Sequence, residues 1–183
     1  MKTVADLLHW EPYLSEAQIE ELKAIECPAR IGRIQAPQDL NDITLGQLIQ
    51  LDTISAEKGV FVAVSVVLLG KSEAWAGTAP AYEMLGLRNM VVAEQTRIKG
   101  LFDSLHREHS AAEIMAGVEK LNFGMFGLAD WYAKRMGISD HEDAFNTPWL
   151  RIWQCLKNDQ EETEYKARLS KVESDLMRSQ IRR

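Results

Sequence analysis

The most constraining feature of this sequence is an apolar run from Val60 to Leu69, VFVAVSVVLL, in which Ser65 is the one polar residue. The segments around the run are amphipathic, so one-faced helices are expected to pack against it. The run is about half as long as a membrane-spanning helix must be. It therefore predicts the centre of a folded core rather than a membrane anchor.

Two secondary structures fit this run. Its β-branched residues are typical of a buried strand. A helix fits as well, because the neighbouring segments have helical periodicity and no other strand is available to pair with it. We predict a helix. The preceding residues are also helical in pattern, since Thr44 and Gln47 form a capping box and apolar residues then recur at helical spacing through Ile54.

The rest of the chain predicts an all-α fold, a single domain of about six to seven helices with a long C-terminal helix. Cap residues and apolar spacing place helices at 2–13, 15–26, 81–107 and 110–136, a helical turn at 139–142, and the last helix from 148 onward.

Three further local predictions concern the segments between and within these helices. Residues 74–79 are expected to form a loop. For residues 30–35, a short strand and an extended loop are both open, because a single strand has no obvious partner. The glycines at 117, 124 and 127 indicate the close approach of another helix backbone.

Composition narrows the class of protein. Hydrophobic residues make up 46% and charged residues 26%, which is typical of a globular chain rather than a disordered one. The net charge of -6 argues against nucleic-acid binding, which usually needs a basic surface. Cys27 and Cys155 form no CxxC motif, and we interpret them as reduced thiols. The N-terminal residues lack the pattern of a signal peptide, so we expect a cytoplasmic protein without a membrane partner.

A polar stretch divides the last helix. Residues 157–164, KNDQEETE, include no apolar residue, and we expect a helical core domain at 1–156 followed by a C-terminal arm at 157–183. Within the arm, apolar residues recur at spacings of four, three and four, as in a coiled coil about two heptads long. This seam consists of Tyr165, Leu169, Val172 and Leu176. We predict that it binds another copy of the chain or a different protein.

Large aromatic rings concentrate between residues 123 and 153. Two interpretations are open: the rings fill the core between the last two long helices, or some of them line a groove for a partner peptide. Trp131 and Trp149 are the candidate partner-binding residues of such a groove. The full set is Phe123, Phe126, Trp131, Tyr132, Trp149 and Trp153.

The histidines give no convincing catalytic or metal site. His106 and His109 have a spacing that zinc sites use, but no third ligand can be identified. Asp140, His141 and Glu142 lie where a helix begins, and acidic residues are favoured there as caps. We therefore expect no catalytic residue, metal or cofactor. A small enzyme built on one of these histidines is the alternative.

The middle of the chain resembles the tail assembly chaperones of tailed phages. The resemblance lies in Thr44–Leu51, TLGQLIQL, in the apolar helix GVFVAVSVVLLG, and in the charged helix that follows Tyr82. It implies a small, acidic, helical, non-catalytic protein of the host cytoplasm. Such a protein would bind the tape-measure protein and help recruit tail-tube subunits. Because residues 110–183 are longer than that pattern, a helical adaptor or ring subunit of the virion is the neighbouring hypothesis.

Overall fold

The apolar run folds as a helix at the centre of the N-terminal half. In the computed structural model, which describes residues 2–105, 111–121 and 123–181, α4 (Val60–Ala63) continues into a π-helical turn, η2 (Val64–Leu68). The Leu69 N–H donates to the Val64 carbonyl at 3.2 Å. The buried Ser65 hydroxyl donates to the Phe61 carbonyl at 2.8 Å, so the one polar side chain of the run is paired. The helix prediction is confirmed.

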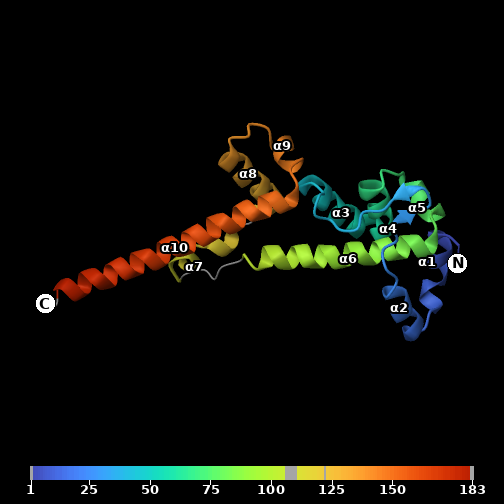
Figure 1. The fold of residues 1–183 in the computed structure, drawn as a ribbon, viewed down its shortest axis with the longest axis horizontal. Helices are drawn as coiled ribbons and strands as arrows, with labels where there is room; N and C mark the ends of the chain where they lie inside the picture. The colour runs from blue at the N-terminus through green and yellow to red at the C-terminus, as the bar shows by residue number, and fades with distance from the viewer. Residues whose placement is uncertain (1, 106–110, 122, 182–183) are drawn as a thin grey trace.

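The other elements of this half surround the long helix α6 (Ala81–Asp103), as Figure 1 shows. Gly59, with a φ of 89°, separates α4 from the preceding helix α3 (Leu45–Lys58). The elements are α1 (Val4–Trp10), η1 (Glu11–Tyr13), α2 (Glu16–Lys23), β1 (Arg30–Ile31), β2 (Ile34–Gln35), α3 (Leu45–Lys58) and α5 (Glu73–Thr78).

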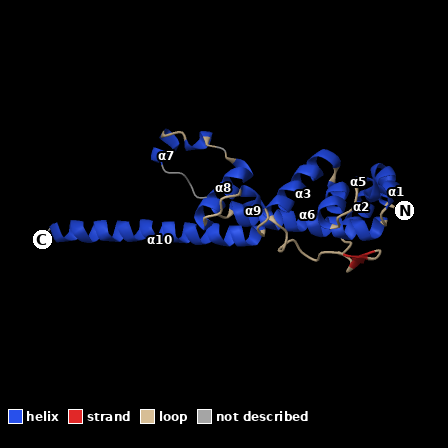
Figure 2. Ribbon diagram, turned by 90° about the horizontal axis from the view of Figure 1, so that it is seen from above, coloured by secondary structure: helices blue, strands red, loops and turns tan. Residues whose placement is uncertain are grey.

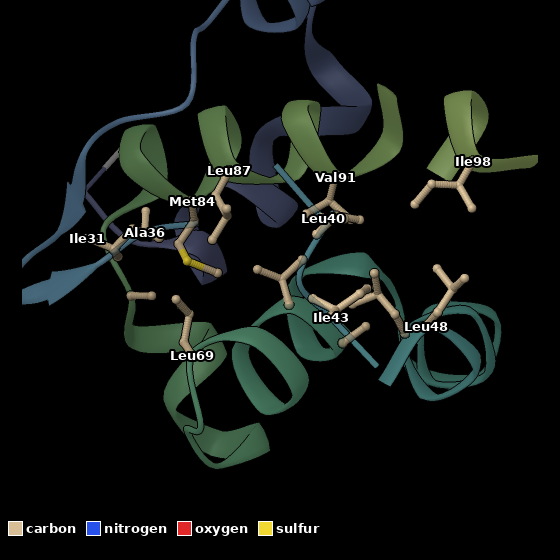
Figure 3. Packing of buried hydrophobic residues seen from close by; sticks show 14 of the residues in the cluster. Ile31, Ala36, Leu40, Ile43, Leu48, Leu69, Met84, Leu87, Val91 and Ile98 are labelled. Carbon is tan, nitrogen blue, oxygen red and sulfur yellow. The ribbon is translucent and has the colours of Figure 1, made fainter. Parts of the chain in front are cut away.

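The main core lies between α6 and the α3–η2 segment. Figure 3 shows side chains of α6 directed toward residues from the loop before α3, from α3 itself and from the end of η2. Burying an aliphatic side chain of this size stabilises a fold by about 1.5–3 kcal/mol, so this layer holds the N-terminal half together. Its members include Leu40, Ile43, Leu48, Val64, Leu69, Met84, Leu87, Val91 and Ile98.

The C-terminal half is built on one very long helix, α10 (Trp149–Ile181), which extends away from the rest of the molecule in Figures 1 and 2. A second buried cluster joins its first turns to α3 and α8, and includes Leu45, Tyr132 and Ile152. The other elements of this half are α7 (Ala111–Met115), η3 (Val118–Lys120), α8 (Gly124–Met136) and α9 (His141–Phe145).

The all-α prediction is confirmed, with ten α-helices among the described residues against the six or seven expected. Residues 30–35 form neither a lone strand nor a loop. They fold as a hairpin in which β1 and β2 are antiparallel, with Ile31 opposite Ile34. Gly32 takes a φ of 57° in the turn, a conformation that favours glycine, and its N–H donates to Glu83 at 2.6 Å.

Two predicted segments are wrong. Residues 74–79 lie mostly in α5 rather than in a loop, because Ala76 is buried against the core and helix formation satisfies the backbone there. The helix expected at 110–136 is broken, because Gly117 and Gly124 take φ of 83° and 54° and cannot continue a right-handed helix. Gly117 therefore separates α7 from η3 and Gly124 begins α8, and the nearest atom to a Cβ at Gly127 would belong to Phe123 in the preceding turn.

Helix boundaries also differ in detail. Helix α6 ends at Asp103, before the predicted residue 107. The turn predicted at 139–142 is the start of α9, which Asp140 caps, because its carboxylate accepts from the Glu142 N–H at 2.9 Å. Residue 110, where the next helix is predicted to begin, lies outside the described residues, whereas the Thr44–Gln47 capping box is confirmed.

We predict that Val64→Asp prevents folding. Val64 has no exposed surface, and an unpaired buried charge costs several kcal/mol against a typical total stability of about 5–15 kcal/mol. The matched control is Val92→Asp, because Val92 lies on α6 with 43% of its surface exposed. Yield of soluble protein and thermal unfolding should separate the two variants, and a folded Val64→Asp protein would contradict the core assignment.

The two glycines inside α6 are predicted to respond oppositely to alanine. A Cβ at Gly86 would lie 2.0 Å from the Glu26 carbonyl oxygen, whereas a Cβ at Gly100 would meet nothing within 4 Å. Gly100→Ala should therefore stabilise the protein by about 1 kcal/mol through helix propensity. Gly86→Ala should destabilise it by about 1–3 kcal/mol or more through overpacking. Denaturant unfolding of both variants measures this difference, and equal effects would refute the close approach.

Candidate interaction surface

The first turns of α10 are anchored in the core. Trp149 is fully buried, and its indole N–H donates to the Leu40 carbonyl at 2.6 Å. The Trp153 indole donates to the Leu101 carbonyl at 3.0 Å, at the end of α6. Ile152 is also fully buried. The start of the helix is therefore fixed to both halves of the body.

An ion pair marks the place where α10 leaves the body. The Arg135 guanidinium on α8 donates to both carboxylate oxygens of Asp159, at 2.9 to 3.1 Å. These hydrogen bonds hold the pKa of Asp159 below its usual range and raise the pKa of Arg135. The polar stretch 157–164 is thus attached at its start by charge rather than by apolar burial. Every side chain from 161 to 179 is exposed.

The predicted seam lies on this exposed part of α10. Tyr165, Leu169, Val172 and Leu176 have exposed fractions of 57%, 41%, 54% and 58%. With 100° of rotation per residue, their side chains fall within an arc of about 60°. They form an apolar stripe on the exposed part of α10, which projects away from the main body in Figure 2.

The stripe faces away from the side of α10 that binds the body. The docking side chains Trp149, Ile152 and Trp153 centre on a direction about 180° from the centre of the seam, by the same rotation per residue. The seam is therefore not a continuation of the docking face. While α10 stays straight, the seam residues cannot pack against the core of their own chain.

The predicted groove around Trp131 and Trp149 is not formed. Trp149 has no exposed surface and belongs to the main core, whereas Trp131 is half-buried against the second cluster. The two rings therefore do not line a common surface, because each packs inward from a different helix. Trp149 is a structural anchor.

Two of the other aromatic rings are exposed instead of buried. Phe123 and Phe126 have exposed fractions of 70% and 58%, and Leu121 and Met125 beside them are also exposed. The interpretation that all six rings fill the core is wrong for these two, because the helix break at Gly124 turns the start of α8 outward. This second apolar patch was not distinguished in the sequence, since exposed and buried rings have the same local spacing.

His141 contacts side chains of α8. Its Nε2 lies 3.2 Å from a carboxylate oxygen of Asp130, and its ring stacks on Phe126 at a centroid distance of 5.0 Å. His106 and His109 lie outside the described residues. Within the described residues, no three His, Cys, Asp or Glu side chains gather in a way that could hold a metal ion.

A mainly apolar cavity of about 430 Å³ lies between the N-terminal helices and α4, α5 and α6. Leu7, Phe61 and Leu85 contribute apolar walls, and Arg88 lines it without an ion pair to any described residue. This cavity could not be predicted from local sequence patterns, because five separate segments contribute its lining.

A scan against protein-family models, a search of curated proteins and a search of solved structures each found no match for this chain. The resemblance to tail assembly chaperones therefore stays a hypothesis. Among the described helices, none is both long and apolar enough to cross a membrane.

We predict that acid weakens the attachment of the arm. Because folding lowers the pKa of Asp159, the stabilisation is present above the unfolded value near 3.8 and is lost as pH falls through the folded value. Between about pH 5 and pH 3, wild type should therefore lose more unfolding free energy than Asp159→Asn. Asp175→Asn, at an exposed residue of the same helix, should behave like wild type. Denaturant titrations across this range measure the slopes, and equal slopes for all three proteins would count against the pair.

Proposed function

We propose that this chain is a non-catalytic assembly protein that binds another protein chain through the seam of α10. The observation that carries the proposal is the direction of the seam, an apolar stripe about 180° away from the docking face on a helix already anchored at its other end. Contiguous exposed apolar surface of this kind is typical of protein interaction sites.

The form of the surface favours helix-to-helix contact. Side chains at spacings of four, three and four pack into the gaps of a facing helix, and a partner helix would cover them along about 16 Å of α10. The ion pair of Arg135 with Asp159 fixes the start of the free segment, so the seam is presented in a defined direction.

We further propose tailed-phage morphogenesis as the setting, with the tape-measure or tail-tube protein as the bound chain. The support is the resemblance of Thr44–Leu51 and of the apolar helix that follows to tail assembly chaperones. The acidic net charge and helical fold agree with that class of protein. An adaptor or ring subunit of the virion would use the same seam.

The experiment is co-expression of this chain with candidate tape-measure and tail-tube proteins, followed by co-purification. A chain that ends at Gln160 keeps the Arg135–Asp159 pair and the whole body, and we expect it to fold but to lose the bound protein. Leu169→Asp in the full chain should also abolish capture, whereas Ala167→Asp on the opposite face should not. Retention of the same bound protein by the truncated chain would refute the proposed role of the arm.

A further inference from the structure

We propose that the arm binds the arm of a second copy of this chain, and that the two helices run antiparallel. This inference rests on the proposed function, because the second copy would use the same seam in the absence of a tail protein. Three features of the exposed segment 161–179 carry it: the packing positions, the flanking charges, and one acidic residue in line with the seam.

The packing positions are compatible with self-pairing. The spacing places Leu169 and Leu176 at a positions and Tyr165 and Val172 at d positions of a heptad. In an antiparallel pair centred between Ser170 and Lys171, Leu169 would meet Val172 of the second copy, and Tyr165 would meet Leu176 of the second copy. In each layer a larger apolar side chain would then pack against a smaller one, and no seam residue would be left without a partner.

The charges beside the seam complement themselves. In this arrangement Lys166 would face Glu173 of the second copy, and Arg168 would face Asp175 of the second copy. Two-fold symmetry repeats both pairs, so every charged residue that flanks the central layers meets an opposite charge. Such reciprocity within one sequence favours a second copy over an unrelated helix.

Glu162 decides the orientation. A parallel pair would also match flanking charges, with Glu161 facing Lys166 and Arg168 facing Glu173. However, Glu162 occupies the a position before Tyr165, so a parallel pair in register would place two Glu162 carboxylates in one layer. The antiparallel pair places Glu162 opposite Ser179 of the second copy, which avoids this like-charge contact.

The shape of the molecule permits this overlap. The arm leaves its body near Gln160, and the exposed segment to Ser179 is about 28 Å long at 1.5 Å per residue. Antiparallel overlap about its centre brings residue 161 of one copy level with residue 180 of the other. The main parts of the two bodies then lie at opposite ends of the paired segment, as the projecting α10 in Figure 2 allows.

The first test is the mass of the full chain in solution, by sedimentation equilibrium over a range of concentrations. Leu169→Asp combined with Val172→Asp should weaken dimerisation by at least about 100-fold, because each chain would put two charges into the interface. Ala167→Asp combined with Ser174→Asp puts the same charges on the opposite face of α10 and should leave the dimer unchanged. Circular dichroism verifies that both variants keep their helix content.

The second test separates the two orientations by charge. Lys166→Glu alone should weaken the dimer, since the introduced carboxylate would face Glu173 of the second copy. Adding Glu173→Lys to the same chain restores an opposite-charge pair in the antiparallel arrangement and should recover dimerisation. In a parallel pair the double variant would instead face Glu161 and Arg168 with like charges and would be weaker than the single variant. Both variants lose the Lys166–Glu162 ion pair, so their comparison is matched.

Each outcome decides the proposal. A dimer that the seam variant disrupts and the charge swap restores supports antiparallel pairing. A full chain that is monomeric at all concentrations, or a dimer indifferent to the seam variant, overturns it. A double variant weaker than the single one overturns the orientation. A monomer that still captures a tail protein through the arm leaves the proposed function standing and removes only the self-pairing.

Discussion

The position of α10 depends on the buried indole of Trp149. Its N–H donates to the Leu40 carbonyl 109 residues away in the sequence, and its ring lies 6.1 Å from that of Phe102. The Arg97 guanidinium lies 5.7 Å over the same ring and is held by Glu94, whose carboxylate also accepts from the Leu40 N–H. Because an unpaired buried N–H is costly, these contacts fix the indole in one orientation. The direction in which the rest of α10 projects follows from that orientation.

Helix α10 changes its role along its length while its backbone stays continuous. Its first turns contribute Trp149 and Ile152 to the core, its middle is held by the charge of Asp159, and its last part exposes the seam. The polar stretch between the two apolar parts is what allows the change of face. If apolar residues had continued at the docking positions, α8 could have covered more of the helix and left a shorter free segment.

Local signals in the sequence were enough to predict most of the long helices and the spacing of the seam, but not the contacts between distant segments. The Thr44–Gln47 cap and the spacing of Tyr165, Leu169, Val172 and Leu176 are set by neighbouring residues, so they can be read directly. Whether Trp149 is buried and Phe126 exposed depends on which segment crosses each ring, and the sequence pattern is the same for both. The break at Gly117 and Gly124 was missed because glycine is compatible with both a helix interior and a left-handed end.

The preformed helix bears on how strong and how reversible an association at the seam would be. An isolated helix of two heptads is marginal in water, because nucleation is costly. Here the exposed turns continue a helix whose first turns are packed in the core, and ion pairs such as Lys166–Glu162 and Arg168–Glu164 stabilise them. Much of the ordering entropy is therefore lost on folding rather than on binding, which favours association. The shortness of the seam weakens association, since few apolar side chains become buried. A rigid arm with a small contact area favours a specific contact that can be released, which suits a protein that acts during assembly.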